Sequence, residues 1–486
     1  MAHQTPDFER LVLKTMEEWK IPGLSVAIVY DYATLAAKKC VANTLFDCGS
    51  TTKTTTAAAV ALLVDDDDYP QMQWSTPVSQ LLPDDFVLSN TQLTKDVTVE
   101  DILSHRTGIA AHDDSYLSVR ARTPDSAKSM TRNLRNLPFA KPLRTAFIYS
   151  NIMYTVATHL VETVSGMPYA EFLRKKIWEP LGMTNTFHDL PDIEAHDAME
   201  RKATGYRWDK EKEKHVAIPA YSSPEGQGAG CIFSSAGDYA KWVRALIKHS
   251  PPLSEAAHIE LITPRTIFPL TEEYDIPFGS PALYCLGLIR ETYRGRTLIS
   301  HDGDVPGFKA KLLYLPEFEW GLVILANLET SLYAEQILSH TLVDEVLSVP
   351  MEERVDWSAF FRKWYDRDKE HNEDDPEFTK PTNPEPLGVA LETLTGTYRD
   401  AGYKDLVLEM KDGKLVADCH DRCFPFVLTL EHLTEGKFAI EVYDVWGGER
   451  RKLKGEIRIQ DGRAVSLGVG FEGEIEGHLT WFDRIE

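Results

Sequence analysis

The sequence contains few cysteines for its length. Six cysteines in 486 residues are too sparse for a disulfide framework, so we expect reduced thiols. Cys419 and Cys423 flank His420, but no second pair of ligands accompanies them, and this spacing does not favour a metal site. We therefore expect neither disulfide bonds nor a bound metal.

Long hydrophobic runs are also missing. No stretch approaches the roughly 18 consecutive apolar residues that a membrane span needs. Residues 1–20 mix acidic and basic side chains with scattered apolar ones, which predicts an amphipathic helix and not a signal peptide. These absences lead us to expect an intracellular, cytoplasmic protein.

Positive charge is scarce as well. The chain has 52 Lys and Arg against 75 Asp and Glu, a formal net charge of −23. Binding to a phosphate backbone requires clustered basic side chains, and anionic lipid headgroups repel an acidic surface. We therefore expect neither nucleic acid nor a membrane as a partner, and the oligomeric state stays open.

The length of the chain favours at least two domains. Within residues 1–350, β-branched residues predict a buried strand at 24–30 and an antiparallel meander at 297–300, 308–315 and 321–326. Helices are predicted at 50–64, 99–104, 152–164, 170–178, 237–248 and 332–347. Strands near both ends that enclose a helical insertion indicate an α/β (α+β) fold, with an antiparallel sheet flanked by helices and an α-rich lobe.

A second domain is predicted after this one. Residues 351–387 predict a helix and a charged linker, because 366–386 contain almost no large apolar residues. Residues 388–486 predict a small antiparallel β-barrel. Short alternating strands at 406–410, 414–417, 438–443 and 453–459 occur there together with Asp-Gly hairpin turns.

Ser50 and Lys53 are the first candidate catalytic pair. They lie one turn apart at the start of a predicted helix, so the amine can reach the hydroxyl. A serine hydroxyl is a weak nucleophile unless a base takes its proton, and desolvation lowers the pKa of a lysine enough to make it that base. The alternative is a helix-capping Ser50 with an exposed Lys53, so the pair needs support from elsewhere.

Two further motifs supply that support. Tyr149 and Asn151 lie on a loop just before a helix, where a phenol can relay protons and an amide can hold a substrate. The alternative is a core tyrosine followed by an asparagine helix cap. His301 and Gly303 end one strand of the meander, and the glycine allows a substrate to lie close to the strand backbone.

Taken in order, these SxxK, YxN and HxG motifs resemble those of the serine β-lactamase and penicillin-binding-protein superfamily, in its class C-like, peptidase S12-type branch. Flanking segments resemble family landmarks in the same order: IPGLSVA at 21–27, FDCGS at 46–50, ILSHRTG at 102–108, WEPLGM at 178–183 and AGCIFSS at 229–235. The resemblance covers about residues 6–348. The tail is similar to the lipocalin-like domain of some D-aminopeptidases and penicillin-binding-protein-type thioesterases.

The resemblance implies a role for each matching residue and no cofactor. The implied catalytic residues are the acylated serine Ser50, its general base Lys53 and the proton relay Tyr149. The implied substrate-binding residues are Asn151, His301, Gly303 and Asp304. The backbone N–H groups of Ser50 and Asp304 are implied to form the oxyanion hole.

Two departures from the family pattern change the expectation. The strand at 24–30 passes almost directly to Ala33 where the family has a full hairpin, so one sheet edge is expected to be trimmed. His301 replaces the lysine with which β-lactamases and carboxypeptidases hold a substrate carboxylate. Asp302 and Asp304 are expected to favour protonated His301 but to repel an anion, which favours substrates other than carboxylates.

The leading hypothesis is a serine hydrolase that forms an acyl-enzyme on Ser50. Its substrate is a small-molecule ester, amide or thioester, or a short peptide. The same residues fit an acyltransferase or a thioesterase/cyclase, and a third hypothesis is a catalytically silent scaffold. Specificity is expected to come from loops at 111–133, 187–224 and 253–281, whose sequence has no recognisable pattern.

Overall fold

The computed structural model describes residues 6–30, 33–36, 43–269, 276–370 and 378–485. Asp31, Tyr32, Cys40 and residues 371–377 of the expected linker lie outside these ranges. The five cysteines within them are free and buried, as predicted. None of the helices in these ranges has both the length and the apolar character needed to cross a membrane.

An eight-stranded antiparallel sheet forms the centre of the first domain, in the order β2-β1-β13-β12-β11-β10-β9-β8. Its strands are β1 (Leu24–Tyr30), β2 (Ala33–Ala36), β8 (Thr266–Ile267), β9 (Leu283–Tyr284), β10 (Ile289–Tyr293), β11 (Arg296–Val305), β12 (Phe308–Leu315) and β13 (Trp320–Ala326). The predicted strand and meander are therefore confirmed. The edge strand β2 pairs with β1. Residues 37–42 beyond it lie outside the described ranges, so the expected trimmed edge stays a prediction.

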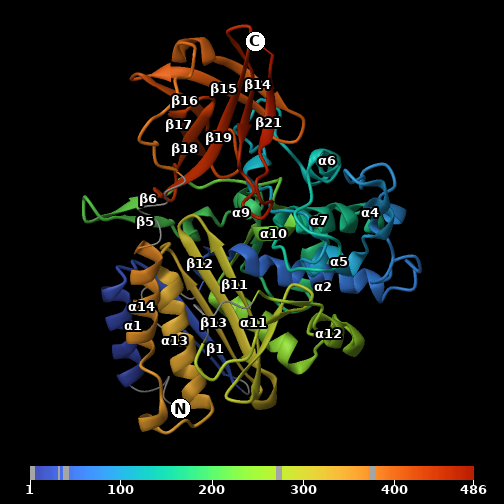
Figure 1. Ribbon diagram of the computed structural model, residues 1–486. Helices are drawn as coiled ribbons and strands as arrows, with labels where there is room; N and C mark the ends of the chain where they lie inside the picture. Colours follow the sequence, from blue (N-terminus) through green and yellow to red (C-terminus); the bar gives the residue numbers. More distant parts are fainter. Residues whose placement is uncertain (1–5, 31–32, 37–42, 270–275, 371–377, 486) are drawn as a thin grey trace.

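Both faces of this sheet are buried, and β1 illustrates why. Val26 and Ile28 pack into a core with α1 (Pro6–Glu18) and α13 (Ser331–Val346). The alternate residues Ala27 and Val29 belong to a second core with α11 (Ala236–Lys248). Side chains of a strand point to opposite faces in turn, so a strand of apolar residues needs helices on both sides. Figure 1 shows α1, α13 and α14 (Trp357–Glu370) together on one side of the sheet.

A helical lobe lies beside the sheet, as predicted (Figure 1). Its central helices are α2 (Thr52–Val64) and α7 (Asn151–Ser165). Around them lie α3 (Val78–Leu81), α4 (Thr91–Asp96), α5 (Val99–Leu103), α6 (Ala127–Asn133), α8 (Tyr169–Leu173), α9 (Asp189–Ala195), α10 (Gln227–Gly230) and α12 (Glu255–Leu261). A helix without a polar face belongs in a core, and α2 is buried along nearly its whole length.

Residues 396–484 form a closed antiparallel barrel of eight strands, which confirms the predicted β-barrel. The strands are β14 (Gly396–Asp400), β15 (Lys404–Lys411), β16 (Lys414–Cys419), β17 (Phe426–Thr434), β18 (Lys437–Asp444), β19 (Arg450–Gln460), β20 (Arg463–Val469) and β21 (Thr480–Arg484). The barrel sits over the sheet and the helical lobe (Figure 1). The exact domain boundaries at 350 and 388 stay a prediction.

Small sheets and turns complete the first domain. A three-stranded sheet has the order β3-β7-β4, and a hairpin pairs β5 with β6. Their bounds are β3 (Phe46–Asp47), β4 (Thr186–His188), β5 (Tyr206–Asp209), β6 (Lys214–Ala217) and β7 (Ile232–Ser234). The predicted helix at 170–178 is divided between α8 and a π-helical turn, Arg174–Trp178.

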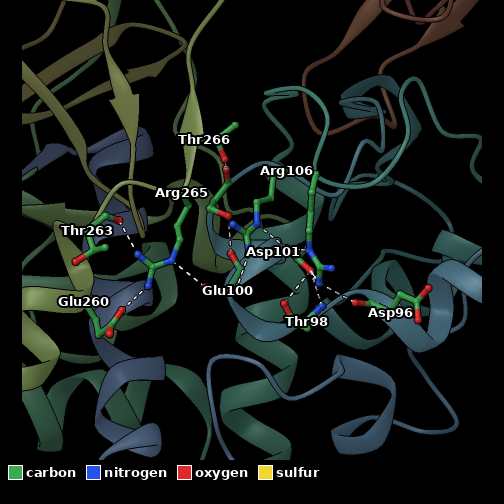
Figure 2. A network of polar contacts seen from close by, with 11 residues as sticks. Asp96, Thr98, Glu100, Asp101, Arg106, Glu260, Thr263, Arg265 and Thr266 are labelled. Carbon is green, nitrogen blue, oxygen red and sulfur yellow. Dashed lines mark hydrogen bonds and ion pairs between the residues drawn. The ribbon is translucent and has the colours of Figure 1, made fainter.

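A buried ion network holds the loop after α5 (Figure 2). The Asp101 side chain is fully buried and accepts hydrogen bonds from Arg106 at 2.5 Å and Arg144 at 2.6 Å. Glu100 binds Arg106 at 2.7 Å and Arg265 at 2.8 Å. Burial alone would raise the pKa of Asp101, but these hydrogen bonds hold it below its usual value. The network therefore ties α5 to the segments that precede β8 and α7.

We expect Asp101→Asn to lower the free energy of unfolding by about 3 kcal/mol, because both arginines lose their buried countercharge. Urea denaturation of the full chain measures this loss. The wild-type advantage should begin to decline below about pH 4, where Asp101 of the unfolded chain becomes protonated. It should be lost only as the pH falls through the lower pKa of Asp101 in the folded protein. Asp7→Asn breaks an exposed pair with Arg10 and should change nothing measurable. Equal effects of the two variants would contradict the role given to Asp101.

Candidate active site

Ser50 lies on a 3-10 turn, η2 (Gly49–Thr51), directly before α2. The turn is pressed against β11, and two glycines make this approach possible. A Cβ built on Gly303 would lie 2.2 Å from the carbonyl oxygen of Cys48, and Gly49 has φ +48°. No side chain fits the first position, and the second has a backbone conformation that favours glycine. The half-buried Ser50 is thereby fixed between helix and strand.

The backbone N–H of Asp304 points toward the serine turn. Val305 pairs with Phe308 across the turn between β11 and β12. Only two residues separate this pair, and the pair that closes a two-residue hairpin turn is hydrogen-bonded. Hydrogen-bonded and non-hydrogen-bonded pairs alternate along an antiparallel ladder, so the next residue, Asp304, directs its N–H away from β12. A Cβ built on Gly49 would lie 2.9 Å from that nitrogen. This geometry fits an oxyanion hole formed by the N–H groups of Asp304 and Ser50. The role of this oxyanion hole stays a prediction. The Asp304 carboxylate is bound by Lys309.

Lys53 is fully buried and makes three contacts with oxygen atoms. Its Nζ lies 2.9 Å from Ser50 Oγ, 2.7 Å from Asn151 Oδ1 and 2.8 Å from the Ala229 carbonyl oxygen. Burial lowers its pKa from 10.5 to about 7, and the negative charge of Asp113 limits the decrease. A neutral amine has two N–H donors and one lone pair. The amide and carbonyl oxygens only accept, so they take both donors and the lone pair faces Ser50.

Tyr149 lies beside this pair. The Lys53 amine is 4.8 Å from the centre of its ring, and the His105 ring is tilted against the Tyr149 ring at a centroid distance of 4.3 Å. Burial raises the pKa of Tyr149, and a hydrogen bond with Ser50 opposes the increase. A phenol with a raised pKa stays protonated at neutral pH and can donate a proton.

Asn151 has both ends of its amide engaged. Its Oδ1 accepts from Lys53, and its Nδ2 donates to both carboxylate oxygens of Asp113 at 3.2 Å. The expected contact with a substrate amide stays a prediction. In this arrangement the side chain joins the buried amine to a carboxylate.

His301 is 2% exposed and neutral. Its Nδ1 donates to the Asp302 carbonyl oxygen at 2.7 Å, and its Nε2 accepts from the Tyr284 hydroxyl at 3.1 Å. Burial, followed by the charge of Lys53, lowers its pKa to about 4. The carboxylate of Asp302 does favour the protonated form, as expected, but its effect is too small to keep His301 protonated. Asp302 raises the pKa by less than burial lowers it, and its carboxylate is held by Lys311 at 2.8 Å.

The structure thus brings together Ser50, Lys53, Tyr149 and Asn151, with Gly303 and the Asp304 backbone against the serine turn. His301 lies next to them but is bonded to Tyr284. Four participants were missed in the sequence: Asp113, His105, Tyr284 and the carbonyl of Ala229. Only His105 and Ala229 fall in segments that resemble family landmarks, and Asp113 lies in a loop without a recognisable pattern. Within the described ranges, no group of His, Cys, Asp and Glu is placed to hold a metal ion.

Comparisons with known proteins agree with this geometry. The family model described as "Beta-lactamase" matches residues 8–341. The protein named "Unguisins hydrolase ungD" from Aspergillus violaceofuscus is 37% identical over 99% of this chain and 90% of its own length. A second protein, "Unguisins hydrolase ungD'" from Aspergillus campestris, is 34% identical over 98% of this chain and 91% of its own length.

A solved structure resembles the whole chain. The octameric penicillin-binding protein homologue from Pyrococcus abyssi has a TM-score of 0.62 and 22% identity over 98% of this chain and 99% of its own. At this identity the likeness concerns the fold alone. It extends through the barrel, so both domains recur together in that protein.

We expect Gly303→Ala to displace β11 from the serine turn, because its Cβ would overlap the Cys48 carbonyl oxygen. The free energy of unfolding should fall by about 2 kcal/mol or more. Thermal unfolding measures the change, and reaction of Ser50 with a fluorophosphonate should slow in the folded fraction. Gly470→Ala is the control, since its Cβ would be 3.5 Å from the nearest atom. A Gly303→Ala variant with wild-type stability and labelling would contradict the required close approach.

Proposed function

Because this chain belongs to the β-lactamase family, we propose that it is a serine hydrolase that forms an acyl-enzyme on Ser50. The observation that carries the proposal is the 2.9 Å contact between the buried Lys53 amine and Ser50 Oγ. A lysine with a pKa of about 7 is neutral often enough near neutral pH to act as a base. A lysine with a purely structural role would not have to lie within hydrogen-bond distance of Ser50 Oγ.

In the first step Ser50 Oγ attacks the substrate carbonyl and its proton passes to Lys53 Nζ. The oxygen of the carbonyl becomes an oxyanion, which the N–H groups of Ser50 and Asp304 stabilise. Such donors typically contribute about 3 kcal/mol each to lowering the barrier. The start of α2 adds the positive end of its dipole.

In the second step the leaving group takes a proton from the Tyr149 hydroxyl, which is hydrogen-bonded to Ser50. Lys53 returns a proton to the phenol. Water then attacks the acyl-enzyme carbonyl and gives a proton to Lys53 Nζ. When the bond between the carbonyl carbon and Ser50 Oγ breaks, Oγ takes this proton from Lys53 and the acid product leaves. These residues supply every proton transfer of the cycle.

The bond cleaved is an amide, ester or thioester in a compound without a carboxylate next to it. His301 supports this choice, because a neutral imidazole bonded to Tyr284 offers no charge to an anion. The two relatives named unguisins hydrolases match nearly the full chain, so we propose unguisins as the substrate.

We expect the purified protein to convert unguisins to products heavier by one water molecule, detected by liquid chromatography with mass spectrometry. Ser50→Ala should reduce the rate by at least about 10⁴-fold, since the nucleophile is lost. Ser89→Ala, a change of an exposed serine, serves as the control and should keep wild-type activity. Turnover by Ser50→Ala at the wild-type rate would overturn the mechanism. Hydrolysis of p-nitrophenyl esters without any action on unguisins would overturn the substrate alone.

We expect kcat/KM to fall below about pH 7, by about tenfold per pH unit, because protonated Lys53 has no lone pair for the Ser50 proton. The neutral base is lost as the pH falls through the lowered pKa of Lys53, about 7. A pH profile between 5 and 9 on one uncharged substrate measures this limb. A rate independent of pH across this range would exclude Lys53 as the base.

A further inference from the structure

The barrel is bonded to the segment 112–118 of the first domain. Arg451 donates to the Asp114 carboxylate at 2.6 Å, and the His112 N–H donates to Glu472 at 3.2 Å. His112 Nδ1 also lies 2.8 Å from the Tyr403 hydroxyl. The residues on both sides of Asp113 are thus held by barrel side chains.

Further along the segment the contacts are between backbones. Cys423 N–H donates to the Tyr116 carbonyl oxygen at 2.9 Å, and Ser118 N–H donates to the Asp421 carbonyl oxygen at 2.9 Å. His112 has a left-handed backbone with φ +53°, which costs free energy in a residue other than glycine. The barrel contacts offset this cost and keep the segment in one conformation.

Asp113 itself points into the first domain. Its two carboxylate oxygens accept from Asn151 Nδ2 at 3.2 Å. Burial raises the pKa of Asp113 to about 7, although the hydrogen bond from Asn151 opposes the increase. Above that pH the ionised carboxylate has no donor, so it bonds only to the NH₂ end of the amide and holds the oxygen end toward Lys53. A reversed amide would present an N–H to the lysine lone pair and compete with Ser50 for it.

From these contacts we propose that Asp113 is a positioning residue for the Lys53 base and that the barrel, through Arg451 and Glu472, holds it in place. The proposal rests on the proposed serine hydrolase function. It gives the C-terminal domain a part in the site: barrel side chains fix the segment, the segment fixes Asn151, and Asn151 directs the lysine lone pair.

The charges around Asp113 add a pH signature. Asp114, Glu472, Lys53 and Tyr116 face it in addition to Asn151, and Tyr403 and Cys423 also interact with it. Above its own pKa of about 7, the negative charge of Asp113 raises the pKa of Lys53. Replacement by a neutral residue therefore moves the acidic limb of the pH profile to lower pH.

Lys53 has its own set of neighbours. Besides Asp113, the thiol of Cys231 acts on its pKa, and the neutral rings of His105 and His301 interact with it. None of these groups changes in an Asp113 variant. A shift of the limb in such a variant thus reports on the lost carboxylate.

The first test is the rate constant with which a fluorophosphonate labels Ser50 in the full chain. We expect Asp113→Ala to slow labelling by about 100-fold, because a misplaced base loses its alignment. Asp113→Asn keeps an acceptor without the charge, so about tenfold slowing and a limb at lower pH are expected. Asp418→Asn, the same change in an exposed residue of the barrel, should match the wild type.

The second test is a double-mutant cycle for the barrel. The Arg451 side chain is 50% exposed, so Arg451→Met is expected to fold, as its thermal unfolding will show. It should slow labelling several-fold in the wild type and not at all in Asp113→Ala, because its effect passes through Asp113. Additive effects of the two changes would overturn the role of the barrel.

The outcomes separate this inference from the proposed function. Wild-type labelling rates and an unmoved pH limb in both Asp113 variants would overturn the positioning role while Ser50 labelling upholds the hydrolase. The positioning role would also be overturned if labelling fell only in proportion to the loss of folded protein and the acidic limb of the pH profile did not move. A wild-type chain whose Ser50 is not labelled at all would overturn both.

Discussion

The burial of one amine is the constraint on which the site depends. A lysine without access to water loses the hydration of its charge, and its pKa falls to about 7. Three oxygen atoms surround Lys53 Nζ within 2.9 Å, one from the serine turn, one from α7 and one from Ala229 in α10. The amine is therefore satisfied in both protonation states, as three donors or as two donors and a lone pair.

The rest of the first domain brings those oxygen atoms together. The sheet carries β11 to the serine turn, where Gly49 and Gly303 allow backbone to lie against backbone. The ion network around Asp101 ties α5 to the segment that leads to Tyr149 (Figure 2). These contacts do not involve the reacting side chains, but they hold together the segments that carry them.

Some of the many acidic residues are buried, and their ionisation lowers the stability of the folded protein at high pH. Burial raises the pKa of Glu225 to about 7 and that of Glu329 to about 8. Both are protonated more readily in the folded protein than in the unfolded chain, so unfolding releases protons and stability declines as pH rises through these values. The base Lys53 needs a pH above about 7. Activity is therefore favoured above about pH 7, whereas stability is favoured below about pH 7 to 8.

The sequence by itself determined the sheet, the barrel and the order of Ser50, Lys53, Tyr149 and Asn151. Strand periodicity, Asp-Gly turns and spacing along one helix are local properties, so they are visible in the chain. The family membership followed from the same motifs and was confirmed over residues 8–341.

Only the tertiary structure decided the charge of His301 and the part of Asp113. Neighbours in the chain suggested a protonated histidine, but burial beneath Tyr284 and the charge of Lys53 outweigh Asp302. Asp113 precedes Asn151 by 38 residues, and the barrel residues that hold its segment follow by more than 300. Desolvation and contacts between distant segments exist only after the chain has folded, and no local pattern encodes them.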